Sequence, residues 1–107
     1  MKKISIYEPA MCCSTGLCGV GVDSELLRIT TLIDSLKKKG IEIERYNLSN
    51  APMKFVQNAS VNKFINTEGV DALPLILVND EIKLIGRYPT KEELSTFLEV
   101  SINFINE

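Results

Sequence analysis

The 107-residue sequence contains no histidine, and all three of its cysteines fall between positions 12 and 18. Without imidazole, the common cysteine–histidine zinc sites are excluded, and an all-cysteine structural zinc site would need a fourth sulfur. Iron–sulfur clusters also generally take four protein ligands. In their usual form, neither kind of site can be completed from the residues of one chain.

Other familiar patterns are missing as well. Gly16, Gly19 and Gly21 are not followed by Gly-Lys-Ser/Thr, so they form no phosphate-binding loop. The apolar stretch after Lys2-Lys3 is too short for a signal peptide or a membrane span, which predicts a cytoplasmic protein with no membrane partner. A formal charge of −2 argues against an extended nucleic-acid surface, although it leaves open a local basic patch on a dimer.

The cysteines form one compact group, Met11-Cys12-Cys13-Ser14-Thr15-Gly16-Leu17-Cys18-Gly19. Neighbouring Cα atoms lie ~3.8 Å apart, below the ~4.4–6.8 Å that an ordinary disulfide spans, so Cys12 and Cys13 should resist pairing with each other. The Ser14-Thr15-Gly16 segment permits a tight reversal of the chain. Cys18 can then join the first two sulfurs at one point.

Thiolates are soft ligands that favour soft centres. The candidates are copper(I), zinc, iron–sulfur clusters, trivalent arsenic and trivalent antimony. Trivalent arsenic and antimony bind as a three-sided pyramid and are complete with three sulfurs, so the ligand count fits them best. Cys12, Cys13 and Cys18 are therefore the predicted metal ligands. As(III) or Sb(III) would be a transported ligand, and we expect no required cofactor and no catalytic residue.

Hydrophobic periodicity and turn residues predict one α/β domain over residues 1–107, in the order strand, helix, strand, helix, strand, strand, helix. The predicted strands cover residues 3–7, 41–46, 74–78 and 82–85, and Asn79-Asp80 is predicted to form the turn of an antiparallel hairpin between the last two. The first predicted helix begins at an Asp23 cap and ends at Gly40. The second carries Val61, Phe64 and Ile65 and ends at Gly69. The third begins at a Thr90–Glu93 capping box.

This order is similar to thioredoxin-like folds, with about four strands in a mixed sheet flanked by helices. In those folds a cysteine loop lies between the first strand and the first helix, and a cis-proline begins the third strand. Leu73-Pro74 stands at the matching point, and we expect a cis bond there. Because a helix N-terminus favours thiolate, the pKa of Cys18 is predicted to be lowered.

The string from Pro9 to Gly19 closely resembles the ArsD family, as do Pro52–Asn58, Leu73-Pro74-Leu75 and Gly86-Arg87-Tyr88-Pro89. The resemblance runs from the first strand to about residue 98. Some members of that family carry further cysteine pairs in a C-terminal tail. This sequence has no cysteine after Cys18, so no role of those pairs is expected here.

The resemblance implies an arsenic metallochaperone that is also a weak repressor of an arsenical resistance operon. The receiving partner would be the ATPase subunit of an arsenite efflux pump, and the donor would be glutathione or another small thiol. The resemblance also implies a homodimer and an operator DNA site. Such a protein is a carrier and not an enzyme.

Several alternatives stay open. A thiol-disulfide oxidoreductase would suit the fold and the place of the cysteines, but it would lack the usual Cys-x-x-Cys spacing. The three cysteines could also simply pack, or meet zinc between subunits. We interpret the lysines at 37, 38 and 39 as complements to the dipole of the preceding helix, and Met11 and Met53 as packing residues. Arg87-Tyr88 could contact a partner or complete a turn before Pro89.

Overall fold

The computed structural model describes residues 3–10 and 24–106. Its elements follow the predicted order, with two additional short helices and a 3₁₀ turn, η1. They are β1 (Lys3–Glu8), α1 (Ser24–Lys38), β2 (Glu42–Asn47), α2 (Pro52–Gln57), α3 (Ala59–Glu68), η1 (Val70–Ala72), β3 (Leu75–Val78), β4 (Glu81–Ile85), α4 (Lys91–Leu98) and α5 (Ile102–Asn106).

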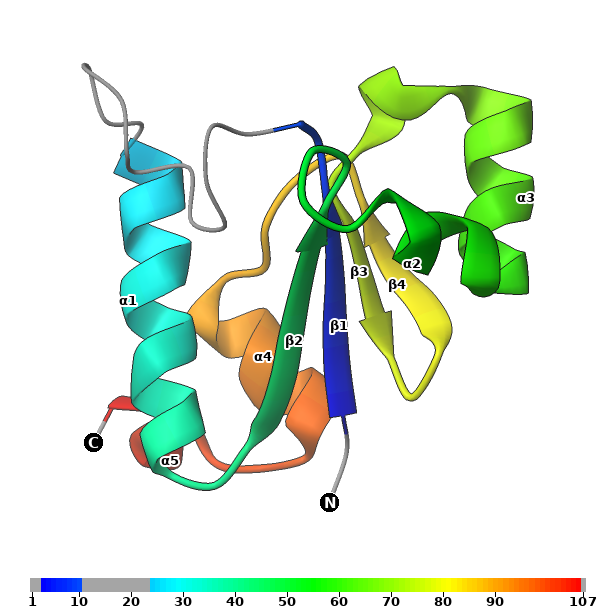
Figure 1. Cartoon of the computed structure of the whole chain (residues 1–107). Helices are drawn as coiled ribbons and strands as arrows, with labels where there is room; N and C mark the ends of the chain where they lie inside the picture. The colour runs from blue at the N-terminus through cyan, green and yellow to red at the C-terminus, as the bar shows by residue number, and fades with distance from the viewer. Residues whose placement is uncertain (1–2, 11–23, 107) are drawn as a thin grey trace.

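The four strands form one mixed sheet in the order β2-β1-β3-β4 (Figure 1). β1 pairs in parallel with β2, as expected for two strands joined through a helix, and it pairs antiparallel with β3. β3 and β4 are antiparallel neighbours. The predicted α/β, thioredoxin-like architecture with a four-stranded mixed sheet is confirmed.

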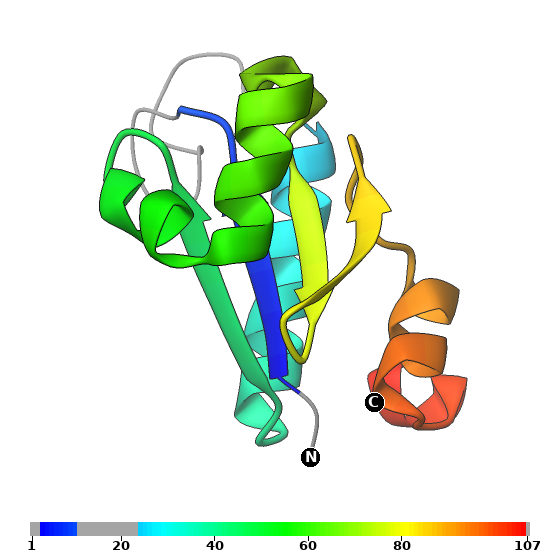
Figure 2. The same ribbon diagram turned by 90° about the vertical axis from the view of Figure 1, so that its right-hand side faces the viewer.

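Helices cover both faces of the sheet, with α2 and α3 on one face and α1, α4 and α5 on the other (Figures 1 and 2). The alternation of side chains along the central strands supplies both cores. Ile4 and Ile6 of β1 join the cluster beneath α1 and α4, whereas Tyr7 joins the cluster beneath α2 and α3. β1 is therefore buried from both sides.

The turn and cap signals are confirmed where the structure describes them. Gly40 ends α1 with φ +89°, and Asn79 and Asp80 connect β3 to β4 with two successive positive φ angles, as a two-residue hairpin requires. Thr90 and Glu93 form the predicted capping box at α4. The Leu73-Pro74 bond is cis. The Asp23 cap lies outside the described residues.

Some sequence predictions were wrong. No helix was predicted between residues 47 and 58, but Pro52 occupies the first turn of the short helix α2, where its missing N–H is not needed. Met53 on that helix is 61% exposed, so it is not a packing residue. Lys39 donates to the backbone oxygens of Phe104 and Ile105 in α5, so it stabilises a different helix from the one it follows.

The carboxyl end of β1 and the N-terminus of α1 lie at the same end of the sheet, measured along the strands (Figure 1). The connection between the first strand and the first helix therefore starts and finishes at the carboxyl end of the parallel pair β1 and β2. Within residues 3–10 and 24–106, no helix is long and apolar enough to cross a membrane.

Candidate functional site

The predicted ligands Cys12, Cys13 and Cys18 lie in residues 11–23, outside the described residues. What the structure describes is the frame on either side of them, which ends at Ala10 and resumes at Ser24. Within the described part of the chain, no group of three histidine, cysteine, aspartate or glutamate side chains could hold a metal ion. The cysteine segment remains a candidate site predicted from the sequence.

Glu8, the last residue of β1, lies fully buried in this frame. Its carboxylate accepts hydrogen bonds from Arg45 of β2, with Nη2 at 2.6 Å from Oε1 and Nε at 3.2 and 3.1 Å from the two oxygens. The hydroxyl of Tyr88 also donates to Oε1, at 2.8 Å. Three elements of the fold thus meet at one buried carboxylate.

Charge balance explains how this carboxylate is accommodated. A buried charge is tolerated when it is paired and hydrogen-bonded, and the Arg45 side chain facing Glu8 is itself only 10% exposed. Among the described residues, every buried side-chain nitrogen and oxygen has a hydrogen-bond partner. Burial, followed by the charge of Glu8 and the hydrogen bond to it, raises the pKa of Tyr88 above its ordinary value, so this hydroxyl stays a donor.

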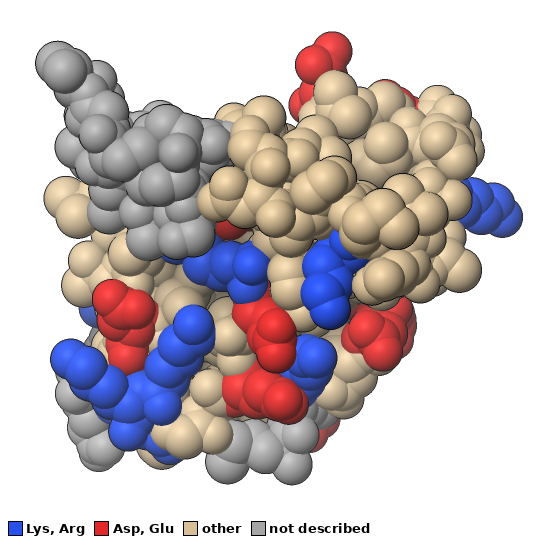
Figure 3. Space-filling view, in the orientation of Figure 1, with Lys and Arg blue, Asp and Glu red and all other residues tan. Residues whose placement is uncertain are grey.

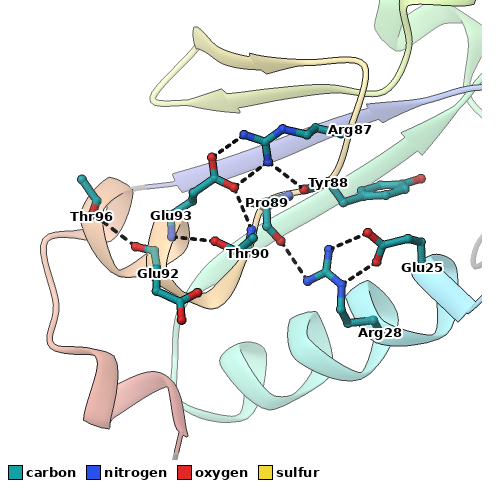
Figure 4. A network of polar contacts seen from close by, with 9 residues as sticks. All are labelled: Glu25, Arg28, Arg87, Tyr88, Pro89, Thr90, Glu92, Glu93 and Thr96. Atoms are coloured by element: carbon teal, nitrogen blue, oxygen red, sulfur yellow. Dashed lines mark hydrogen bonds and ion pairs between the residues drawn. The ribbon is translucent and has the colours of Figure 1, made fainter.

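Two arginines tie α1 to the rest of the frame. Arg45 Nη1 donates to Thr30 Oγ1 of α1 at 2.9 Å, which connects the buried pair to the helix that follows the cysteine segment. Closer to the start of α1, Arg28 Nη1 donates to the backbone oxygen of Pro89 at 2.9 Å (Figure 4). The same guanidinium pairs with Glu25. The first turns of α1 are therefore fixed at two points.

A third arginine–carboxylate pair lies at the surface beside this frame (Figure 4). Arg87 donates to both oxygens of Glu93, at 2.6 and 2.7 Å, while the backbone N–H of Thr90 donates to Glu93 Oε1. The hydrogen bond from Arg87, followed by the one from Thr90, lowers the pKa of Glu93 to about 2. This pair orders the connection between β4 and α4, which carries Tyr88.

Sequence reasoning missed Glu8 and Arg45 as members of the frame. A signal was present, because Glu8 ends the first strand and the only basic residue of the neighbouring strand β2 is Arg45. Arg87 and Tyr88 were expected either to contact a partner or to complete a turn. The structure shows Tyr88 directed to Glu8 and Arg87 held by Glu93.

Comparison with known proteins assigns the family. The model of the arsenical resistance operon protein ArsD matches residues 1–107. Two proteins from Escherichia coli, each named arsenical resistance operon trans-acting repressor ArsD, are 44% and 41% identical to this chain over 96% and 95% of it, and over 86% and 85% of their own length.

A solved structure agrees with the sequence comparisons. The crystal structure of an arsenical resistance operon trans-acting repressor from Bacteroides vulgatus is 48% identical, with a TM-score of 0.88 over 94% of this chain and 95% of that one. The family model and these relatives match nearly the whole sequence, and the solved structure has the same fold. The chain is a member of the ArsD family.

Proposed function

We propose that this protein is a carrier of trivalent arsenic or antimony that holds the metalloid through the thiolates of Cys12, Cys13 and Cys18. The observation that carries the proposal is the grouping of all three cysteines within seven positions in a member of the ArsD family. The described residues on either side support it, because the end of β1 and the start of α1, which flank the cysteine segment, lie at the same end of the sheet.

The chemistry of loading balances without a redox step. Arsenous acid, As(OH)₃, exchanges its three hydroxyl groups for three sulfurs, and each thiol proton leaves with a hydroxyl as water. A divalent metal would instead release protons into solution on binding to thiols. Arsenite uptake should thus depend less on pH than zinc uptake would.

Release of the metalloid to a recipient also needs no redox step. Thiol exchange can proceed one sulfur at a time, so a recipient with its own cysteines can take the ion in steps. We propose that glutathione or another small thiol delivers the metalloid and that the ATPase subunit of an arsenite efflux pump receives it. The protein would act in the cytoplasm as a homodimer, with no cofactor and no catalytic residue.

A second function, repression of an arsenical resistance operon, is favoured by the names of the two Escherichia coli relatives. The face of the molecule in Figure 3 shows basic and acidic side chains side by side, and the surface over α2 and α3 carries few charges. On that face the described side chains form no continuous basic stripe. Because the formal charge of the chain is −2, we expect operator binding to be weak and salt-sensitive, and a gel shift with and without arsenite tests it.

The carrier proposal is tested by anaerobic titration of the fully reduced protein with arsenite and antimonite, with bound metalloid counted by elemental analysis. We expect one ion per chain in the wild type and sharply weaker binding in Cys18→Ser. Ser14→Ala is the matched control, since it changes a polar side chain of the same segment without removing a sulfur.

Either of two results would contradict the proposal. One is a wild-type protein that binds no metalloid, and the other is binding that is unchanged in Cys18→Ser. Turnover of a disulfide substrate, with a reversible disulfide between Cys18 and Cys12 or Cys13, would identify a thiol-disulfide oxidoreductase instead.

A further inference from the structure

We propose that Arg45 is a positioning residue for the metalloid site, because it ties the strand that leads into the cysteine segment to the helix that leads out of it. This inference rests on the proposed carrier function. Arg45 and its partners Glu8 and Thr30 would act on the site without contacting the metalloid.

The contacts of Arg45 divide between the two flanks of residues 11–23. Its Nε and Nη2 bind the carboxylate of Glu8, which stands three positions before Met11. Its Nη1 binds Thr30 Oγ1, in the second turn of α1. A single planar guanidinium therefore links the end of β1 to the second turn of α1.

This link is well suited to fix a geometry. Glu8 is fully buried and Arg45 nearly so, which means that water does not compete for their hydrogen bonds. Arginine presents its donors in a rigid fork, so it constrains direction as well as distance. Tyr88 adds a further hydrogen bond to Glu8 from the connection between β4 and α4. Arg28 of α1 binds the neighbouring Pro89, so this connection is a second, less direct link between the flanks.

Three-sulfur binding should respond to such a constraint. Cys12 and Cys13 follow the first flank and Cys18 precedes the second, so the ligands are drawn from both ends of the segment. Binding is tighter when the ligand groups are held near their bound arrangement beforehand, because less freedom is lost on binding. Loosening the link between the flanks should weaken the metalloid complex more than it weakens the fold.

Thr30→Val is the sharpest test, since valine has nearly the same shape and removes only the oxygen that Arg45 binds. We expect the arsenite dissociation constant of this variant to rise by up to about tenfold, the limit reached if the whole energy of a hydrogen bond to a charged group served to hold the thiols in their bound arrangement. Thr30→Ser restores the oxygen and should bind like the wild type. In both variants X-ray absorption should still count three sulfurs around arsenic.

Tyr88→Phe separates positioning from general loosening. It removes one hydrogen bond from the same buried carboxylate without touching the hydrogen bond from Arg45 to α1. Urea unfolding of all three variants under reducing conditions gives their stabilities. We expect Tyr88→Phe to lose at least as much stability as Thr30→Val and yet keep wild-type arsenite affinity.

The outcomes are distinguishable. Wild-type affinity in Thr30→Val, or equal loss of affinity in Thr30→Val and Tyr88→Phe at equal loss of stability, would overturn the positioning role and leave the carrier function standing. Absence of arsenite binding in the wild type would overturn the carrier function itself, and the inference with it.

Discussion

Two arginine–carboxylate pairs in this fold have the same closest distance and very different surroundings. Arg45 Nη2 lies 2.6 Å from Glu8 Oε1, with side chains 10% and 0% exposed. Arg87 Nη1 also lies 2.6 Å from Glu93 Oε1, with side chains 55% and 26% exposed. Distance alone would rank the two pairs as equals, but their access to water does not.

The difference lies in what replaces a lost partner. If one member of the surface pair is removed, water solvates the other, so the interaction contributes little to stability and is screened by salt. If one member of the buried pair is removed, the other is left charged in a dry site. Substitution of one member should therefore lower the stability of the protein strongly at the buried pair and only slightly at the surface pair.

The largest expected effect comes from breaking the buried pair on one side. Arg45→Met should lower the free energy of unfolding by about 3–5 kcal/mol, because Glu8 then loses its counter-charge while it remains buried. Urea unfolding of the reduced protein measures this change. A loss no larger than that of the surface variants would show that water reaches Glu8 and that the two pairs are alike.

A smaller effect is expected when both charges are removed together. Glu8→Met with Arg45→Met replaces the pair by apolar groups of similar size, which often restores stability. Because Tyr88 and Thr30 would lose their partners, we expect a remaining loss of about 1–2 kcal/mol in the same urea experiment. If the double variant were as unstable as Arg45→Met alone, the unpaired charge would not be the cause.

The smallest effect is expected at the surface pair, and it should depend on pH and salt. The pKa of Glu93 is lowered from 4.5 to about 2, so its contribution to stability is present above pH 4.5 and is lost as the pH falls toward 2. Arg87→Met should raise this pKa toward its ordinary value and reduce the loss over that interval. Thermal unfolding from pH 2 to pH 6, at low and at high salt, measures both dependences.

Much of the fold could be predicted because its signals are local. The capping box at Thr90 and Glu93, the hairpin at Asn79 and Asp80, and the helix end at Gly40 each rest on residues a few positions apart. Short-range chemistry of this kind is visible in a sequence. The helix α2 was missed because only six residues form it, and packing of Phe55 into the core supports it more than any repeated pattern.

By itself, the sequence determined the chemistry of this protein: three sulfurs without a fourth ligand or an imidazole, placed between the first strand and the first helix. The residues that frame them become neighbours only when the chain has folded. Glu8 and Arg45 are 37 positions apart, and Glu8 and Tyr88 are 80 apart. No local pattern joins such residues, because their interaction depends on shared burial, and burial exists only after the sheet and α1 have packed together.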